Sequence, residues 1–351
     1  MIVPAFFVAC SVHRQLSAKR TTIDIIIVVP PGELDTSHRE FAQSRGLLID
    51  ETMALDVVHD IRISEGRLSR ATLMKLLLAG HFARRYDKLL YLDADLTIHG
   101  DVGGLFDLAM GHHAIAAVPS ARILSDLPSE EIERIQRHLE LLGMTPPYRY
   151  FNSGVMLIQP EAWNAGRLTE RSLQFIRNNP ELCGLPDEDS LNAVLDGDIL
   201  ALSPIWNARP DRLWANAFEP VIIHYAGINK PWHRFGRYKR IRDLAAAYRA
   251  YQSFVVDTPW PGFLRTQWKA RDLCGSIWHE VESLAGSLNG VQSRRRRSRK
   301  ADFRDEFRRY IRDSEFVDLD QGIAVRERGF IRCLSKQEVS RVQPEATRDN
   351  R

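Results

Sequence analysis

The sequence lacks the features that mark membrane-spanning and secreted proteins. No apolar run approaches the roughly 20 residues that a helix needs to span a bilayer, and residues 1–10 lack the basic start of a secretory signal. No Cys-x-x-Cys pair occurs, and the four cysteines lie far apart, at Cys10, Cys183, Cys274 and Cys333. Such spacing is typical of free thiols in a reducing compartment. We therefore expect a cytoplasmic protein.

The sequence also lacks a strong charge of one sign, since 48 basic residues face 45 acidic ones and the net charge is +3. This balance gives no argument for nucleic acid as a partner, and no nucleic-acid-binding module is present. The basic excess gathers in the run RRRRSRK, from Arg294 to Lys300. This run predicts either peripheral contact with an anionic membrane or a solvated, partly disordered terminus.

Apolar runs typical of strands alternate with amphipathic helical patterns along most of the 351 residues. We expect strands at 22–29, 55–58, 89–92, 114–118, 151–159, 200–202 and 221–224. Helices are expected at 2–16, 37–45, 69–82, 128–142, from 160 onward, at 187–195 and at 243–251. The alternation predicts an α/β domain over residues 1–255, with a mostly parallel sheet flanked by helices. Residues 256–351 are expected to form a helical, basic extension.

Two carboxylates, Asp93 and Asp95, follow the apolar run LLYL. In an extended backbone, side chains two residues apart point to the same side, so both carboxylates could bind one hard cation. Mg²⁺ or Mn²⁺ suits such oxygen ligands, and either ion suits a phosphate-bearing substrate. The alternative is a pair of solvated aspartates in a turn.

Polar residues also follow or begin several other expected elements. Asn152 and Ser153 begin an apolar strand, beside a glycine, and could equally be turn residues. The acidic run Asp187–Asp189 begins a helix, where carboxylates often serve only as caps. His224 ends the strand VIIH, and Lys230 follows it. An ion on Asp93, Asp95 and His224, with Lys230 nearby, would make a diphosphate site. Possible sugar-stacking or core residues are Trp206, Trp214 and Trp232.

The order YLDADL, FNSGVMLI, LPDEDSLNAVL and IIHYAGINKPW resembles glycosyltransferase family 8, which includes glycogenin and bacterial lipopolysaccharide galactosyl- and glucosyltransferases. The resemblance covers about residues 1–235. It implies a GT-A fold (Rossmann-like), a UDP-glucose or UDP-galactose donor, a saccharide or glycolipid acceptor, and transfer with retention of anomeric configuration. It also implies Mn²⁺, with Mg²⁺ as an alternative. By motif match the site residues are Asp93, Asp95 and His224 for the metal, Asn152 and Asp187 for the donor sugar, and Gly227 and Lys230 for the diphosphate. Ser153, next to Asn152, is also expected to bind substrate.

The chain departs from the family pattern in three places. A strand and an acidic loop that bind uridine usually precede the opening helix; their absence indicates a start codon placed too late or a weakened nucleotide site. Glu188 stands where glutamine is common. Lys75 stands where arginine is common, which predicts a looser grip on the donor. Asp187 or Glu188 would be the nucleophile of a double displacement. In a front-face substitution the leaving diphosphate takes the acceptor proton and Asp187 positions the sugar.

Two other functions fit parts of the sequence. LLYLDADLT also matches the haloacid dehalogenase phosphatase pattern, in which Asp93 would be the nucleophile, Asp95 the general acid, and Asp196 or Asp198 an Mg²⁺ ligand. That pattern normally lies on the first strand, whereas several expected elements precede it here. The second alternative is a non-catalytic scaffold derived from a glycosyltransferase.

Overall fold

The computed structural model describes residues 2–16, 23–61, 70–120, 129–144, 150–210, 219–227, 229–233, 244–266, 324–327 and 330–333. Its α-helices are α1 (Ile2–Gln15), α2 (Thr36–Ser44), α3 (Leu78–Phe82), α4 (Ser129–Leu141), α5 (Pro160–Ala165), α6 (Leu168–Asn178), α7 (Pro186–Leu195), α9 (Leu244–Val256) and α10 (Phe263–Thr266). Its strands are β1 (Ile26–Val28), β2 (Leu48–Asp50), β3 (Leu89–Leu92), β4 (Leu96–Ile98), β5 (Ile115–Pro119), β6 (Phe151–Ile158), β7 (Leu200–Ala201), β8 (Ile222–His224), β9 (Ala324–Glu327) and β10 (Phe330–Cys333). Short 3₁₀ helices are η1 (Asp56–Val58), η2 (Arg70–Leu76), η3 (Gly103–Asp107), η6 (Pro180–Leu182) and η7 (Pro204–Trp206).

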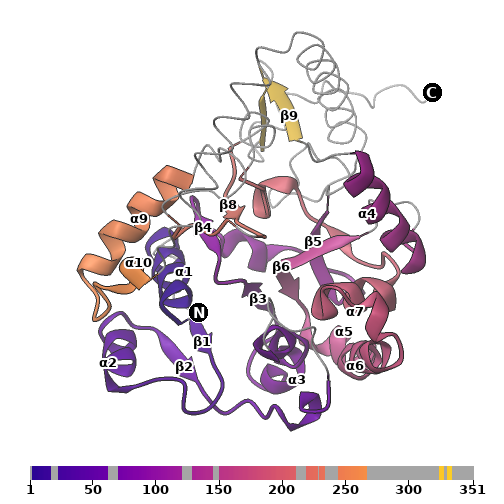
Figure 1. The fold of residues 1–351 in the computed structure, drawn as a ribbon, viewed down its shortest axis with the longest axis horizontal. Helices are drawn as coiled ribbons and strands as arrows, with labels where there is room; N and C mark the ends of the chain where they lie inside the picture. Colours follow the sequence, from indigo (N-terminus) through magenta and orange to yellow (C-terminus); the bar gives the residue numbers. More distant parts are fainter. Residues whose placement is uncertain are drawn as a thin grey trace, which may run out of the picture.

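A four-stranded sheet in the order β3-β6-β5-β7 lies at the centre (Figure 1). β6 runs antiparallel to both β3 and β5, and only β5 and β7 are parallel within it. β1 pairs with β2 in parallel, whereas β4 and β8 are antiparallel. The α/β class is confirmed, but the expectation of a mostly parallel sheet is wrong for the described strands. Hydrophobic periodicity gives the face of a residue and not the direction of its neighbour strand, so the sequence could not reveal this.

The antiparallel direction of β6 is what builds the site described below. Leu92, at the end of β3, is the register partner of Val155 in β6. The segment from Asn152 to Gly154 therefore lies beside Asp93, at the end of β3. In a parallel pairing the same segment would lie at the opposite end of the sheet.

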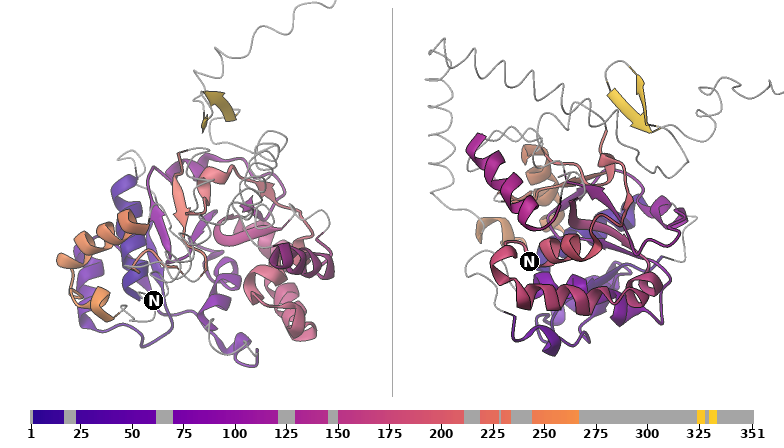
Figure 2. Two further views of the ribbon diagram at one scale, coloured as in Figure 1. Left: turned by 45° about the horizontal axis from the view of Figure 1, so that its top comes forward. Right: turned by 90° about the vertical axis from the view of Figure 1, so that its right-hand side faces the viewer.

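Helices cover both faces of the central sheet. In β5, Ala116 and Val118 belong to one hydrophobic cluster while Ile115 and Ala117 belong to another, so the strand is buried on both sides. On one face α1 packs against α9, and Phe7 stacks on Tyr251 with ring centroids 3.8 Å apart. Figure 1 and the left view of Figure 2 show α9 in orange against α1 in indigo. On the other face lie α3, α5, α6 and α7.

Two expected elements differ in the structure. The run at 55–58 contains the 3₁₀ helix η1 and no strand. The strand that pairs with β1 is β2, which ends at residue 50, whereas the expected strand ended at residue 58. A short apolar run cannot be assigned to strand or helix by periodicity alone. The helix expected at 69–82 is divided into η2 and α3. The remaining expected elements of residues 1–255 have counterparts among those named above.

Most of the expected C-terminal extension, including Arg294 to Lys300, lies outside the described residues. The described part beyond residue 266 is the antiparallel pair β9 and β10. The domain boundary at residue 255 stays a prediction. Among the described helices, none is both long and apolar enough to cross a membrane.

Candidate active site

Asp93 and Asp95 lie in the turn that joins β3 to β4. Asp93 follows the last residue of β3, and Asp95 comes directly before Leu96, the first residue of β4. The expectation that both extend a strand is therefore wrong, although their carboxylates still converge. At this turn the chain leaves the central sheet and pairs with β8, where Leu96 is the register partner of His224. The turn and this pairing together bring both aspartates to the histidine.

The two aspartates and His224 form a compact group of metal-ligating atoms. His224 Nε2 lies 3.2 Å from Asp95 Oδ1 and 3.7 Å from Asp93 Oδ2, and the three ligand atoms lie within 4.8 Å of one another. Lys230 Nζ donates to Asp95 Oδ2. Burial acts to raise the pKa of the Asp95 carboxyl, but His224 and Lys230 outweigh burial and hold that pKa below its usual value. This donor set of oxygens and one imidazole fits a divalent cation.

The ring of His224 is held by Asn207. Asn207 Nδ2 donates to Asn152 Oδ1 over 2.8 Å, which identifies Asn207 Oδ1 as the atom 3.0 Å from His224 Nδ1. An oxygen there accepts the Nδ1 proton, so Nε2 is the ring nitrogen that faces the aspartates and that a metal ion would contact. Sequence analysis missed Asn207, because its place depends on an isolated bridge between Ala208 and Ile223 that no local pattern marks.

Gly154 provides the space in which the histidine ring sits. A Cβ atom at this position would stand 2.2 Å from His224 Cε1 and 2.8 Å from Asp93 Oδ2, closer than real Cβ atoms approach other atoms. Gly154 is not among the residues with positive φ, so close approach and not backbone conformation requires the glycine. Its carbonyl also accepts the Asp93 N–H over 2.8 Å.

Lys75 links the metal-ligating group to the start of α7. Its side chain is 4 % exposed, and Nζ lies 2.7 Å from Asp187 Oδ2, 3.3 Å from Asp93 Oδ1 and 3.1 Å from Ser153 Oγ. The ammonium also lies 4.8 Å from the ring centroid of Tyr91. Burial acts to lower the pKa of Lys75, but the two carboxylates outweigh it and raise that pKa well above its usual value. The lysine is therefore an internal cation shared by two carboxylates.

Asn152 and Ser153 are bonded to the acidic start of α7. Asn152 Nδ2 donates to Glu188 Oε2 over 2.7 Å, and the Ser153 N–H donates to the same oxygen over 3.0 Å. Ser153 Oγ donates to Asp187 Oδ2, also over 3.0 Å. These four residues, which sequence analysis had associated with the donor sugar or the chemistry, therefore form one connected network beside Asp93.

The third acidic residue, Asp189, supports the helix instead. Its Oδ2 accepts the N–H of Leu185, the residue that caps α7. Its Oδ1 accepts from Tyr150 Oη over 2.7 Å and from His138 Nε2 over 3.0 Å. The helix-capping alternative thus holds for Asp189, whereas Asp187 and Glu188 face the network around Asp93.

The remaining candidates divide between the site and the core. Gly227 follows β8 with φ of +115°, a conformation that favours glycine, and adjoins the segment that carries Lys230. Trp206 and Trp232 are buried in the hydrophobic cluster beneath α1 and α9, so both fill the core. Trp214 lies outside the described residues.

The phosphatase alternative requires Asp196 or Asp198 near Asp93. Asp198 instead belongs to a separate group of ligating atoms, with its Oδ1 2.8 Å from His113 Nδ1. Asp196 ends α7 in the left-handed conformation, with φ of +50°. β1 and β2 also precede β3, so the Asp-x-Asp sequence does not follow the first strand. This arrangement does not favour a phosphatase.

Solved structures of similar fold are glycosyltransferases of the GT-A type. The galactosyltransferase LgtC in complex with donor and acceptor sugar analogs matches with a TM-score of 0.59 and 19% sequence identity, over 76% of this chain and 96% of that one. At this level of identity the likeness shows the fold, and the fold class predicted from the sequence is confirmed.

Similar sequences carry related names. The lipopolysaccharide 1,2-glucosyltransferase of Escherichia coli (strain K12) is 29% identical over 204 residues, which cover 55% of this chain and 56% of that protein. The lipopolysaccharide 1,3-galactosyltransferase of Salmonella typhimurium is 27% identical over 186 residues, 48% of this chain and 51% of that protein. The chain thus spans about half the length of these curated relatives.

The match extends to the family as a whole. Residues 28–236 fit the family model described as glycosyl transferase family 8, which is more than half of the 351 residues. That range includes both candidate metal-ligating aspartates, the start of β6, the start of α7 and the segment after β8. The chain belongs to glycosyltransferase family 8.

Proposed function

We propose that the protein is a metal-dependent, retaining hexosyltransferase that moves glucose or galactose from a UDP-sugar to a hydroxyl of a glycan or lipid-linked acceptor. The observation that supports this most directly is the convergence of Asp93, Asp95 and His224, from two distant parts of the chain, beside the ammonium of Lys230. The names of the relatives favour a hexosyl group and a lipopolysaccharide-like acceptor.

Asp93, Asp95 and His224 would hold Mn²⁺, with Mg²⁺ as the alternative, because the site offers more oxygen than nitrogen ligands. When bound, such an ion offsets the negative charge that develops on a departing diphosphate. Lys230 stands beside a metal ligand, so its ammonium would share in binding the diphosphate, and Gly227 would let the backbone approach it.

Asn152, Ser153, Asp187 and Glu188 would bind and orient the donor sugar. Asp187 is held by the buried Lys75 at 2.7 Å and by Ser153 Oγ at 3.0 Å, an arrangement that suits a fixed positioning group better than a nucleophile. We therefore favour front-face substitution. In that reaction the acceptor oxygen bonds to the anomeric carbon on the face from which the diphosphate leaves, and the diphosphate takes the acceptor proton. Glu188 remains the alternative nucleophile.

The decisive experiment measures UDP release from UDP-glucose, UDP-galactose and their N-acetyl forms, with and without Mn²⁺. We expect Mn²⁺-dependent release from one of the first two donors and its loss in Asp95→Asn. Robust turnover of p-nitrophenyl phosphate that disappears in Asp93→Asn would instead identify a phosphatase. A folded protein without metal-dependent UDP binding in calorimetry would indicate the scaffold.

A double displacement can be distinguished with Glu188→Gln, which keeps the shape of the side chain and replaces the nucleophilic carboxylate by a weakly nucleophilic amide. If Glu188 forms a covalent intermediate, this variant loses transfer altogether. If the reaction proceeds on the front face, transfer persists, with a changed KM because Asn152 and Ser153 lose a charged acceptor.

A cytoplasmic enzyme with a lipid-linked acceptor would act at the inner face of the membrane. The run from Arg294 to Lys300 supplies the charge for peripheral contact with anionic lipid. Removal of residues 294–351 should weaken binding to anionic liposomes and leave UDP binding intact. Unchanged liposome binding would end this part of the proposal.

A further inference from the structure

A second group of potential metal ligands lies at the other end of the central sheet. His112 and His113 come shortly before β5, and Asp198 comes shortly before β7. β5 and β7 are parallel neighbours, so the segments that precede them meet at the same edge. The candidate active site lies past the opposite end of β5, where Pro119 is the register partner of Phe151 in β6. The length of β5, about 13 Å at 3.3 Å per residue, separates the two groups.

The donor atoms of this group are spaced as the ligands of one ion are. Asp198 Oδ1 lies 2.8 Å from His113 Nδ1 and 3.7 Å from His112 Nε2, and all three atoms lie within 4.8 Å of one another. A tetrahedral ion with bonds of about 2.0–2.1 Å keeps its ligand atoms about 3.3 Å apart. The two distances lie on either side of that value, so small side-chain movements would suffice to bind the ion.

A hydrogen bond between His113 and Asp198 does not by itself explain where the side chain of His112 lies. The side chain of His112 is 78% exposed, yet its ring lies 4.1 Å from that of His113, centroid to centroid, and turns Nε2 toward the same carboxylate. Two neighbouring imidazoles that face one carboxylate form a set of three converging donors. Nitrogen ligands from histidine and oxygen ligands from aspartate are among those that bind Zn²⁺ in proteins.

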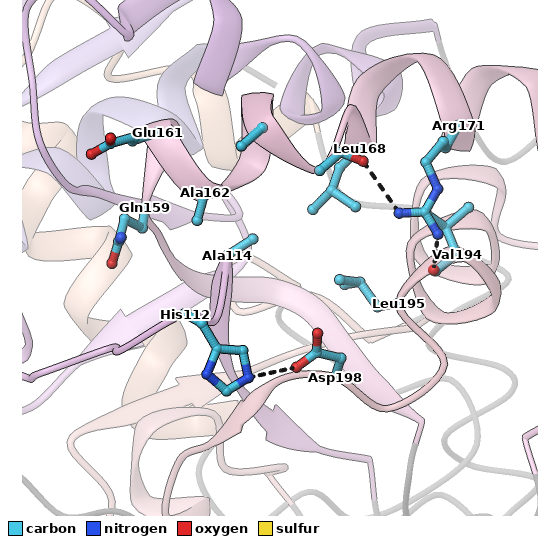
Figure 3. A pocket seen from close by; sticks show the side chains of 12 residues that line it. His112, Ala114, Gln159, Glu161, Ala162, Leu168, Arg171, Val194, Leu195 and Asp198 are labelled. Atoms are coloured by element: carbon cyan, nitrogen blue, oxygen red, sulfur yellow. Dashed lines mark hydrogen bonds and ion pairs between the residues drawn. The ribbon is translucent and has the colours of Figure 1, made fainter.

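A pocket adjoins the group and leaves room for a further ligand. It has a volume of about 620 Å³, and His112 and Asp198 line it together with Gln159, Glu161 and Arg171. Figure 3 shows His112 and Asp198 facing each other at its edge. Arg171 donates to the carbonyl of Val194 over 2.8 Å and so stabilises the end of α7, which lies shortly before Asp198 in the chain. Three protein ligands and an open fourth position are the arrangement of zinc sites that bind water or a small anion.

We propose that His112, His113 and Asp198 form a second metal site, which binds Zn²⁺ and ties the start of β5 to the start of β7. Imidazole ligands favour zinc and similar transition metals, whereas the two carboxylates of the Asp93 group favour Mn²⁺ or Mg²⁺. The two sites should therefore differ in the metal that they prefer. This proposal does not depend on the proposed transfer reaction.

The test titrates Zn²⁺ into the purified full chain in competition with a chromophoric zinc chelator, with Mn²⁺ in large excess to occupy the Asp93 group. His113→Ala and Asp198→Asn should each weaken zinc binding at least about 100-fold, since even residues behind metal ligands contribute about 10- to 100-fold. Two controls should keep the affinity of the wild-type protein: Asp95→Asn in the candidate active site, and His59→Ala, which removes another exposed histidine.

Thermal unfolding provides a second measurement. With the same excess of Mn²⁺ present, Zn²⁺ should raise the Tm of the wild-type protein and of both controls, and should not raise that of His113→Ala or Asp198→Asn. His112→Ala guards against misfolding, because its exposed ring can be removed without disturbing the core. Zinc binding that is absent from the wild-type protein, unchanged in all three variants of this group, or lost only in Asp95→Asn would overturn the proposal.

Discussion

Replacement of Gly154 by alanine tests whether the candidate metal ligands are held as the structure indicates. The added Cβ would stand 2.2 Å from His224 Cε1, more than 1 Å inside the 3.4 Å at which ordinary contact begins. The ring has little freedom to move away, because His224 is 4 % exposed and Asn207 holds Nδ1 at 3.0 Å. Either the ring or the strand must shift, which typically costs about 1–3 kcal/mol in a packed interior.

The same shift would displace a ligand atom from the metal position. We expect Gly154→Ala to lower the free energy of unfolding by about 1–3 kcal/mol in urea and to weaken Mn²⁺-dependent UDP binding at least about tenfold in calorimetry. Gly80→Ala is the matched control, since its Cβ would meet nothing closer than Asn164 Oδ1 at 3.9 Å. Within α3 that control should gain about 0.5–1 kcal/mol.

A specific result would refute this reasoning. If Gly154→Ala binds UDP and Mn²⁺ as the wild-type protein does and unfolds at the same urea concentration, the ring of His224 is not fixed where the structure places it. The metal-ligating role of His224 would then lose its geometric support, while Asp93 and Asp95 would remain candidates.

Further perturbations test the residues around the site and the fold. Asn207→Ala removes the acceptor of the His224 Nδ1 proton, so Mn²⁺ affinity measured by calorimetry should fall about 10- to 100-fold, and an unchanged affinity would contradict the role of Asn207. Lys75→Met leaves the carboxylates of Asp93 and Asp187 without the cation between them. The free energy of unfolding in urea should therefore fall by about 3–5 kcal/mol. A variant as stable as the wild-type protein would show that Lys75 is dispensable for stability. Burial acts to raise the pKa of Asp50, but hydrogen bonds, foremost from His81, lower it overall. Its contribution to stability is therefore present above about pH 4 and is lost as the pH falls through its folded pKa, so Asp50→Asn should flatten the acid limb of the unfolding profile.

The sequence predicted which side chains converge better than how they are arranged. Asp93, Asp95 and His224 could be named as candidate ligands because carboxylates and imidazole after apolar strands are a chemical pattern that residue letters carry. The two aspartates occupy a turn because β3 pairs with β6, whereas the next strand, β4, pairs with β8. Pairing partners are distant in sequence, and hydrophobic periodicity does not identify them.

Sequence analysis missed Asn207, and it noted Gly154 only as a glycine beside Asn152 and Ser153. Asn207 and Gly154 influence His224 by a hydrogen bond and by close approach, and both effects exist only after three segments have come together. The motif match gave Lys75 a role in donor binding, which stays a prediction, and the structure adds that its ammonium contacts both Asp187 and Asp93. A residue letter indicates a charge, and the fold decides which partner neutralises it.

The charge balance of the site bears on the order in which its ligands bind. Three carboxylates, of Asp93, Asp95 and Asp187, contact two ammonium groups, of Lys75 and Lys230. Both cations are thus already engaged, and the site has an excess of negative charge that would repel a diphosphate. A divalent cation held by Asp93 and Asp95 would offset that excess and would compete with Lys230 for Asp95, leaving the ammonium available to the diphosphate of the proposed donor. Without a divalent cation, UDP should therefore bind weakly even at the highest UDP concentration that can be tested. Metal binding should precede donor binding.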